Sequence, residues 1–121
     1  MANKDFRTFE EFYPFYLSQH MNEICRYLHY LGTCCGLTTL IYGLLSGSLY
    51  AKLLCFVPGY FFAWIGHFFF EKNKPATFKY PGFSFRGDWV MCYHFLTGQL
   101  DQHLANAREL YPNENQYQKE Y

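Results

Sequence analysis

One apolar stretch dominates this sequence. Residues 27–70 read YLHYLGTCCGLTTLIYGLLSGSLYAKLLCFVPGYFFAWIGHFFF, and their only formal charge is Lys52. A soluble domain of 121 residues keeps much of its surface in water, so it can hardly hide such a run. The sequence therefore predicts a membrane protein.

The stretch divides into two apolar runs, residues 30–45 and 53–70, around residues 46–52, which have the composition of a turn. With its flanks, each run approaches the roughly 20 residues that cross a bilayer as a helix. We expect an antiparallel transmembrane hairpin. Glycines four residues apart, such as Gly32 and Gly36, are consistent with close packing of its two arms.

Two histidines lie symmetrically in this hairpin. If Ser48 is the midpoint of the turn, His29 precedes it by 19 residues and His67 follows it by 19. At about 1.5 Å of rise per residue the two imidazoles reach the same depth, near the membrane boundary on the side of both termini. Glu71 shares a helix face with His67. Imidazole and carboxylate ligands together suit iron or zinc.

Helices are also expected on both sides of the hairpin. Residues 6–20 carry aromatic side chains at helical spacing, so this segment is expected to lie along the membrane surface. A break near Met21 and Asn22 lets His20 fold back toward His29 and His67, with Asn22 capping a helix from about Glu23.

The C-terminal part is expected to begin with a loop over residues 78–85. Asp88 then caps a helix beginning near Trp89. One face of that helix carries a set of large side chains: Trp89, Tyr93, Leu96, Leu100 and Leu104. The fold class is all-α, a small integral membrane helical bundle in one domain, residues 1–110, with a polar tail, residues 111–121.

Charge and cysteine content narrow the class further. Ten basic residues balance ten acidic ones, which argues against nucleic acid as a partner, and the five cysteines include no C-x-x-C pair. Most basic residues fall on the side of the termini, so the positive-inside tendency places the termini and the site in the cytoplasm. The membrane would be the inner membrane of a bacterium, or the endoplasmic reticulum in a eukaryote.

Several motifs give the chain a family resemblance over about residues 6–100. They are FYPFYL at residues 12–17 leading to His20; Asn22, Arg26, Leu28, His29, Gly32 and Thr33; AWIGHFFFEKNKPATF at residues 63–78; Arg86-Gly87-Asp88; and Leu96-Thr97-Gly98. With these motifs the chain resembles the 2-hydroxy fatty acid dioxygenase family, in its bacterial branch. It departs from the pattern at Cys25, where asparagine is expected, and at Glu23, where bacterial relatives often have proline.

The resemblance implies an iron(II)-dependent enzyme that uses dioxygen to shorten a 2-hydroxy fatty acid by one carbon. By motif, the essential metal-binding residues are His20, His29 and His67. Glu71 is a further candidate as a ligand or as a residue behind the ligands, and His94 is the candidate for a fourth imidazole. The candidate substrate-binding residues are Tyr16, Asn22 and Lys74. Membrane lipids are the expected surroundings.

Two other functions remain open on the sequence. The first is a membrane lipid hydrolase in which zinc-bound water replaces iron and dioxygen. The second is a non-enzymatic membrane scaffold that packs against partner helices. Membrane di-iron hydroxylases fit less well, because their H-x-x-H-H clusters are absent from the sequence.

Overall fold

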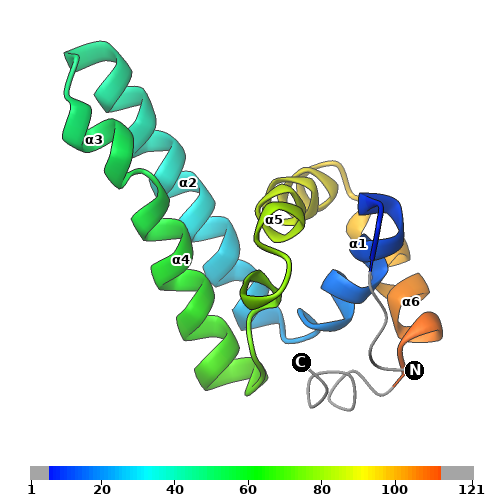
Figure 1. The fold of residues 1–121 in the computed structure, drawn as a ribbon. Coiled ribbons are helices and arrows are strands. Elements are labelled where there is room, and N and C mark those ends of the chain that lie inside the picture. The colour runs from blue at the N-terminus through cyan, green and yellow to red at the C-terminus, as the bar shows by residue number, and fades with distance from the viewer. Residues whose placement is uncertain (1–5, 113–121) are drawn as a thin grey trace.

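The computed structural model describes residues 6–112, and within them it contains helices and no strand. In chain order the elements are α1 (Phe9–Ser18), α2 (Glu23–Ser46), α3 (Leu49–Leu54), α4 (Phe56–Ile65), η1 (Gly66–Glu71), η2 (Ala76–Phe78), α5 (Pro81–Leu96) and α6 (Leu100–Leu110). Figure 1 shows a long hairpin of α2 with α3 and α4 beside a cluster of α1, α5 and α6.

The predicted hairpin is present, with a tighter turn than expected. The Asn22 side chain accepts hydrogen bonds from the backbone of Ile24 and Cys25 and so starts α2. Gly47 ends α2 in the left-handed conformation at φ 74°, and Ser48 caps α3. The second arm therefore begins at Leu49, inside the expected turn of residues 46–52.

The two arms approach each other at the glycines. A Cβ on Gly32 would lie 3.0 Å from the Cα of Gly59, and one on Gly36 would lie 2.6 Å from the backbone oxygen of Cys55. Backbone therefore packs against backbone along the hairpin, as the spacing of small residues predicted.

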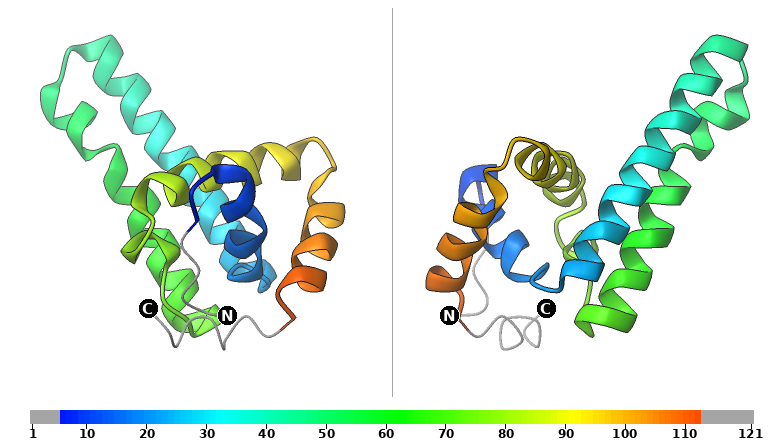
Figure 2. Two further views of the ribbon diagram at one scale, coloured as in Figure 1. Left: turned by 45° about the vertical axis from the view of Figure 1, so that its right-hand side comes forward. Right: turned by 180° about the vertical axis from the view of Figure 1, so that it is seen from behind.

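Both arms, residues 23–46 and 49–71, are long and apolar enough to cross a membrane, and only 17% of the most apolar window of each is buried within the protein. Leu45 and Tyr50, near the tip, are 84% and 81% exposed. The tip extends away from the other helices in all three views (Figures 1 and 2). An exposed apolar surface of this extent is typical of a face that contacts lipid or another protein.

The main core lies between α1, α5 and α6. Phe12, Tyr16 and Leu17 of α1 are almost completely buried there, together with Met91 of α5 and Leu104 of α6. The aromatic stripe of residues 6–20 thus packs inside the protein. Its side chains position the end of α1, and with it His20.

The C-terminal helices differ from the expectation. The expected loop at residues 78–85 is helical from Pro81, because proline is well suited to the first turn of a helix. Asp88 therefore lies inside α5 and caps nothing. Gly98, at φ 76°, separates α5 from α6. Leu96 is therefore exposed while Leu104 is buried, and the prediction that both lie on one face of a single helix is wrong. Most of the predicted tail lies outside the described residues.

Candidate metal centre

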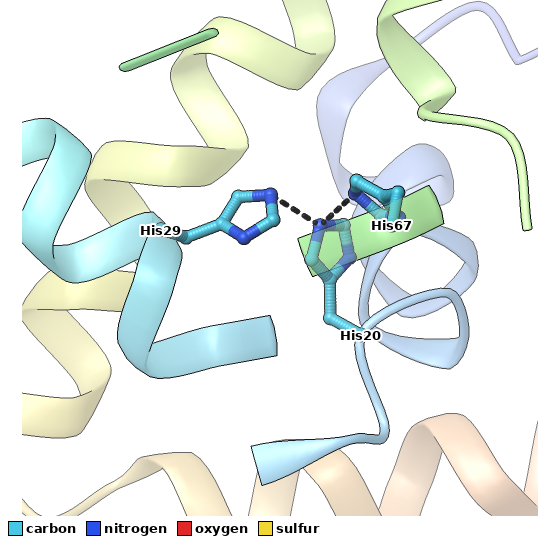
Figure 3. A group of neighbouring side chains, drawn as sticks. All are labelled: His20, His29 and His67. Carbon is cyan, nitrogen blue, oxygen red and sulfur yellow. Dashed lines mark hydrogen bonds between the residues drawn. The ribbon is translucent and has the colours of Figure 1, made fainter. Parts of the chain in front are cut away.

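Three histidines from three separate elements meet at the base of the hairpin (Figure 3). His20 follows α1, His29 lies two turns into α2, and His67 lies in η1; all three are buried. Their Nε2 atoms converge, since the His20 atom lies 3.1 Å from that of His29 and 3.0 Å from that of His67. The structure thus brings together the three histidines that the sequence singled out.

The opposite ring nitrogen of each histidine faces an oxygen that can only accept. The Nδ1 of His20 lies 2.5 Å from the carbonyl oxygen of Tyr16, and the Nδ1 of His29 lies 2.7 Å from that of Cys25. The Nδ1 of His67 lies 2.7 Å from the side-chain oxygen of Asn73. Each Nδ1 must therefore carry the proton and donate it.

This tautomer leaves three Nε2 lone pairs directed at one another with no proton between them. Such an arrangement is repulsive when empty and favourable around a cation, which is the usual reason for fixing a histidine tautomer at a metal site. Burial, with His29 and His67 as neighbours, holds the pKa of His20 well below its usual range. The neutral form that a metal requires is thus the stable one. The triad can hold a metal ion.

An unusual helix end places His67 and its partner. η1 is a π-helix, a form that often occurs at functional sites. It ends at Lys72, whose φ of 61° turns the chain back, and the Asn73 backbone then donates to the His67 carbonyl oxygen over 3.0 Å. The Asn73 side-chain nitrogen donates to the Gln19 carbonyl oxygen over 3.1 Å, which fixes its amide orientation and joins η1 to the end of α1.

Glu71 lies at a different junction. Its carboxylate accepts a hydrogen bond from the backbone nitrogen of Asn22, where the chain enters α2. Arg26 holds the same segment from the other side by donating to the carbonyl oxygen of His20 over 2.8 Å. In the structure Glu71 supports the segment that carries His20. Among the described residues, the group that could bind a metal consists of the three histidines and does not include Glu71.

His94 lies outside the triad. Its Nδ1 is 2.8 Å from the hydroxyl of Tyr13, and its ring stacks on that of His103 with 4.0 Å between the centroids. Burial, then the nearby His103, lowers the pKa of His94. The histidine pair belongs to the packing of α5 and α6 against α1.

The candidate substrate-binding residues have different surroundings. Tyr16 is buried, its ring stacks on that of His20 at 4.1 Å, and its hydroxyl donates to Asp88. The side-chain oxygen of Asn22 is used in starting α2, and its backbone nitrogen donates to Glu71. Lys74 lies on an exposed, apolar depression with Phe68, Phe78 and Lys79.

Sequence reasoning missed two residues of this region. Asn73 has a signal in the sequence, because it is the polar, uncharged residue between Lys72 and Lys74, close enough after His67 for the chain to fold back on it. Asp88 was placed at a helix end, yet its carboxylate is paired with Tyr16 beside the site. Burial raises the pKa of Asp88 to about 7.

Comparison with protein-family models matches residues 6–100 to the family described as 2-hydroxy-palmitic acid dioxygenase Mpo1-like. Comparisons with curated proteins and with solved structures give no match. The matched region includes the whole hairpin, the three histidines, Asn73 and Asp88. It therefore covers every residue of the candidate metal centre, and the chain belongs to the Mpo1-like family.

Proposed function

We propose that this protein is an iron(II)-dependent dioxygenase that shortens 2-hydroxy fatty acids by one carbon. The observation that carries the proposal is the buried histidine triad, in which each Nδ1 faces an acceptor oxygen and the three Nε2 atoms converge. The family name supplies the substrate class and the use of dioxygen. Three neutral imidazoles leave coordination positions open for a chelating substrate and for oxygen, as such chemistry requires.

The proposed setting is a membrane crossed by the hairpin. Its apolar arms would lie among lipid chains, with the triad at the boundary on the side of the termini, which the positive-inside tendency assigns to the cytoplasm. A 2-hydroxy acid has a polar head and a hydrocarbon tail, so its head would lie at this depth. The membrane is the inner membrane in a bacterium or the endoplasmic reticulum in a eukaryote.

Each residue of the centre has a defined part in this proposal. His20, His29 and His67 would hold the metal, which when bound supplies the redox chemistry with dioxygen. The carbonyl groups of Tyr16 and Cys25 hold two of the imidazole rings in the competent tautomer. Asn73 holds the third, and burial keeps bulk water away from the site.

The test is metal analysis combined with oxygen uptake. Anaerobically purified protein is expected to contain about one iron per chain and to consume oxygen when 2-hydroxypalmitic acid is added, but not with palmitic acid. The variants His20→Ala, His29→Ala and His67→Ala are each expected to lose both properties, whereas His103→Ala is the matched control and keeps them.

Other outcomes would refute the proposal. Stoichiometric zinc, with release of fatty acid from lipid and no oxygen uptake, would identify the hydrolase instead. A scaffold would be identified by two results together: the wild-type protein contains no metal, and cells that carry His67→Ala have the same lipid profile as wild-type cells.

A further inference from the structure

An apolar groove runs along the hairpin next to the histidines. It lies between α2, the second arm and α5, has a cavity volume of about 130 Å³, and is open on one side. Its lining includes Gly32, Leu40, Phe56, Gly59, Phe85 and Asp88. On each helix the lining residues recur about every four residues, mostly as adjacent pairs, so each helix contributes one continuous face.

The groove has an inner end at Gly32, about one helical turn from His29, and an outer end toward the tip of the hairpin. Gly32, three residues after His29, faces Gly59 at the inner end. Leu40 and Phe56 lie further along the arms, and Phe56 contacts Phe85 with 5.7 Å between the ring centroids. The helical rise over the eight steps from Gly32 to Leu40 corresponds to a groove about 12 Å long.

Asp88 connects the groove to the metal centre. It lines the groove and accepts a hydrogen bond from Tyr16, whose ring stacks on that of His20. It is also the only charged residue among those that line the groove. The lining is therefore mostly apolar, with the hydroxyl side chains of Thr33 and Tyr60 and with the Asp88 carboxylate on the side of the histidine triad, which matches a molecule with a hydrocarbon tail and one polar end.

The mouth of the groove is itself apolar. Leu37, Phe56, Phe85 and Trp89 line it and are each between 40% and 50% exposed. In the membrane setting proposed above, the mouth would open toward lipid chains. A hydrocarbon tail could therefore enter sideways without passing through water.

We propose that this groove holds the hydrocarbon chain of the 2-hydroxy fatty acid while its head lies at the histidines. The inference rests on the proposed function for the identity of the substrate. The groove itself is tested separately, by binding.

The binding test uses photolabelling of the full chain in lipid nanodiscs. A 2-hydroxypalmitic acid that carries a diazirine at its methyl end is expected to label the protein near Leu40 and Phe56. Unlabelled 2-hydroxypalmitic acid should suppress this labelling. A phosphatidylcholine with a diazirine in its acyl chain serves as the comparison; if it labels the same segment and the hydroxy acid does not displace it, ordinary lipid fills the groove and the proposal is overturned.

Chain-length selectivity provides the second measurement. Leu40→Trp fills the outer end, and displacing about two methylene groups of a long tail corresponds to a roughly tenfold loss of transition-state binding. The ratio of kcat/KM for 2-hydroxypalmitic acid to that for 2-hydroxyoctanoic acid should therefore fall roughly tenfold. Ile41→Trp is the matched control, because the neighbouring Ile41 is exposed and does not line the groove, and the ratio should not change.

The two measurements separate failure of the groove from failure of the reaction. If the protein takes up oxygen but the label lies on other segments, or the kcat/KM ratio is unchanged in Leu40→Trp, then the groove does not hold the hydrocarbon chain although the protein is a dioxygenase. If the label lies near Leu40 and Phe56 and unlabelled 2-hydroxypalmitic acid suppresses it, but no oxygen is taken up, then the groove binds the hydrocarbon chain and the proposed reaction is refuted.

Discussion

Replacing Asn73 by alanine should weaken metal binding without removing a ligand. The other two histidines donate their Nδ1 protons to backbone carbonyl groups, which no substitution can delete, whereas His67 donates to the Asn73 side chain. Without that acceptor, His67 is free to take the other tautomer. Its Nε2–H would then point at the Nε2 of His20, 3.0 Å away, and close the site to a cation.

The expected loss of metal affinity in Asn73→Ala can be estimated from other metal sites. Removing the partner behind a metal-bound histidine typically costs roughly 10–100-fold in metal affinity, which is about 1.4–2.8 kcal/mol. Asn73→Asp keeps an oxygen acceptor for His67 and should retain most of the affinity, although it loses the hydrogen bond donated to Gln19.

The assay is anaerobic iron(II) titration against a chelating competitor, with near-UV circular dichroism as the check on folding. Lys72→Asn is the matched control, since asparagine tolerates the left-handed conformation at that neighbouring exposed position. Folded Asn73→Ala protein with wild-type iron affinity would show that Asn73 does not control the tautomer of His67. Loss of affinity equal to that of His67→Ala would also count against the reasoning, because one ligand position would then have been destroyed outright.

Three further predictions concern packing, pH and the Glu71 carboxylate. In Gly66→Ala the new Cβ would lie 2.9 Å from the Sγ of Cys25 and 3.2 Å from its Cα, which should cost about 1–3 kcal/mol of stability by thermal unfolding. Cys25→Ala in the same chain removes the sulfur and should restore part of this loss, and no restoration at all would refute the contact with the sulfur. Burial raises the pKa of Asp88 to about 7, so between about pH 4 and 7 the folded protein binds one proton more than the unfolded chain. The free energy of unfolding should therefore fall as pH rises through that window, by at most about 4 kcal/mol. Asp88→Asn should abolish this slope, measured as midpoints of chemical unfolding in detergent, and an unchanged slope would be the contrary result. Glu71→Gln weakens the hydrogen bond from the Asn22 backbone and should lower stability by about 1–2 kcal/mol while iron content stays near wild type; loss of the iron would identify Glu71 as a ligand.

Much of the fold could be predicted from the sequence, because its decisive features are local. A run of 44 residues with the single charge of Lys52 can be satisfied by two apolar helices, and the turn residues between them set the hairpin. Helical rise then puts His29 and His67 at one depth. The structure confirms that these two histidines meet and that His20 joins them.

The tertiary structure alone decided how the remaining residues are used. Asp88 looks like a helix cap in the sequence and instead lies half-buried within α5, paired with Tyr16, because Pro81 starts the helix earlier than the polar pattern suggests. Asn73 acquires its role only when the π-helix folds the chain back onto His67. Hydropathy and helical periodicity report which segments leave water and which faces they bury, so they determine the hairpin. Hydrogen bonds between residues far apart in the chain depend on how those segments pack, and it is these bonds that bring three histidines together as a candidate metal centre.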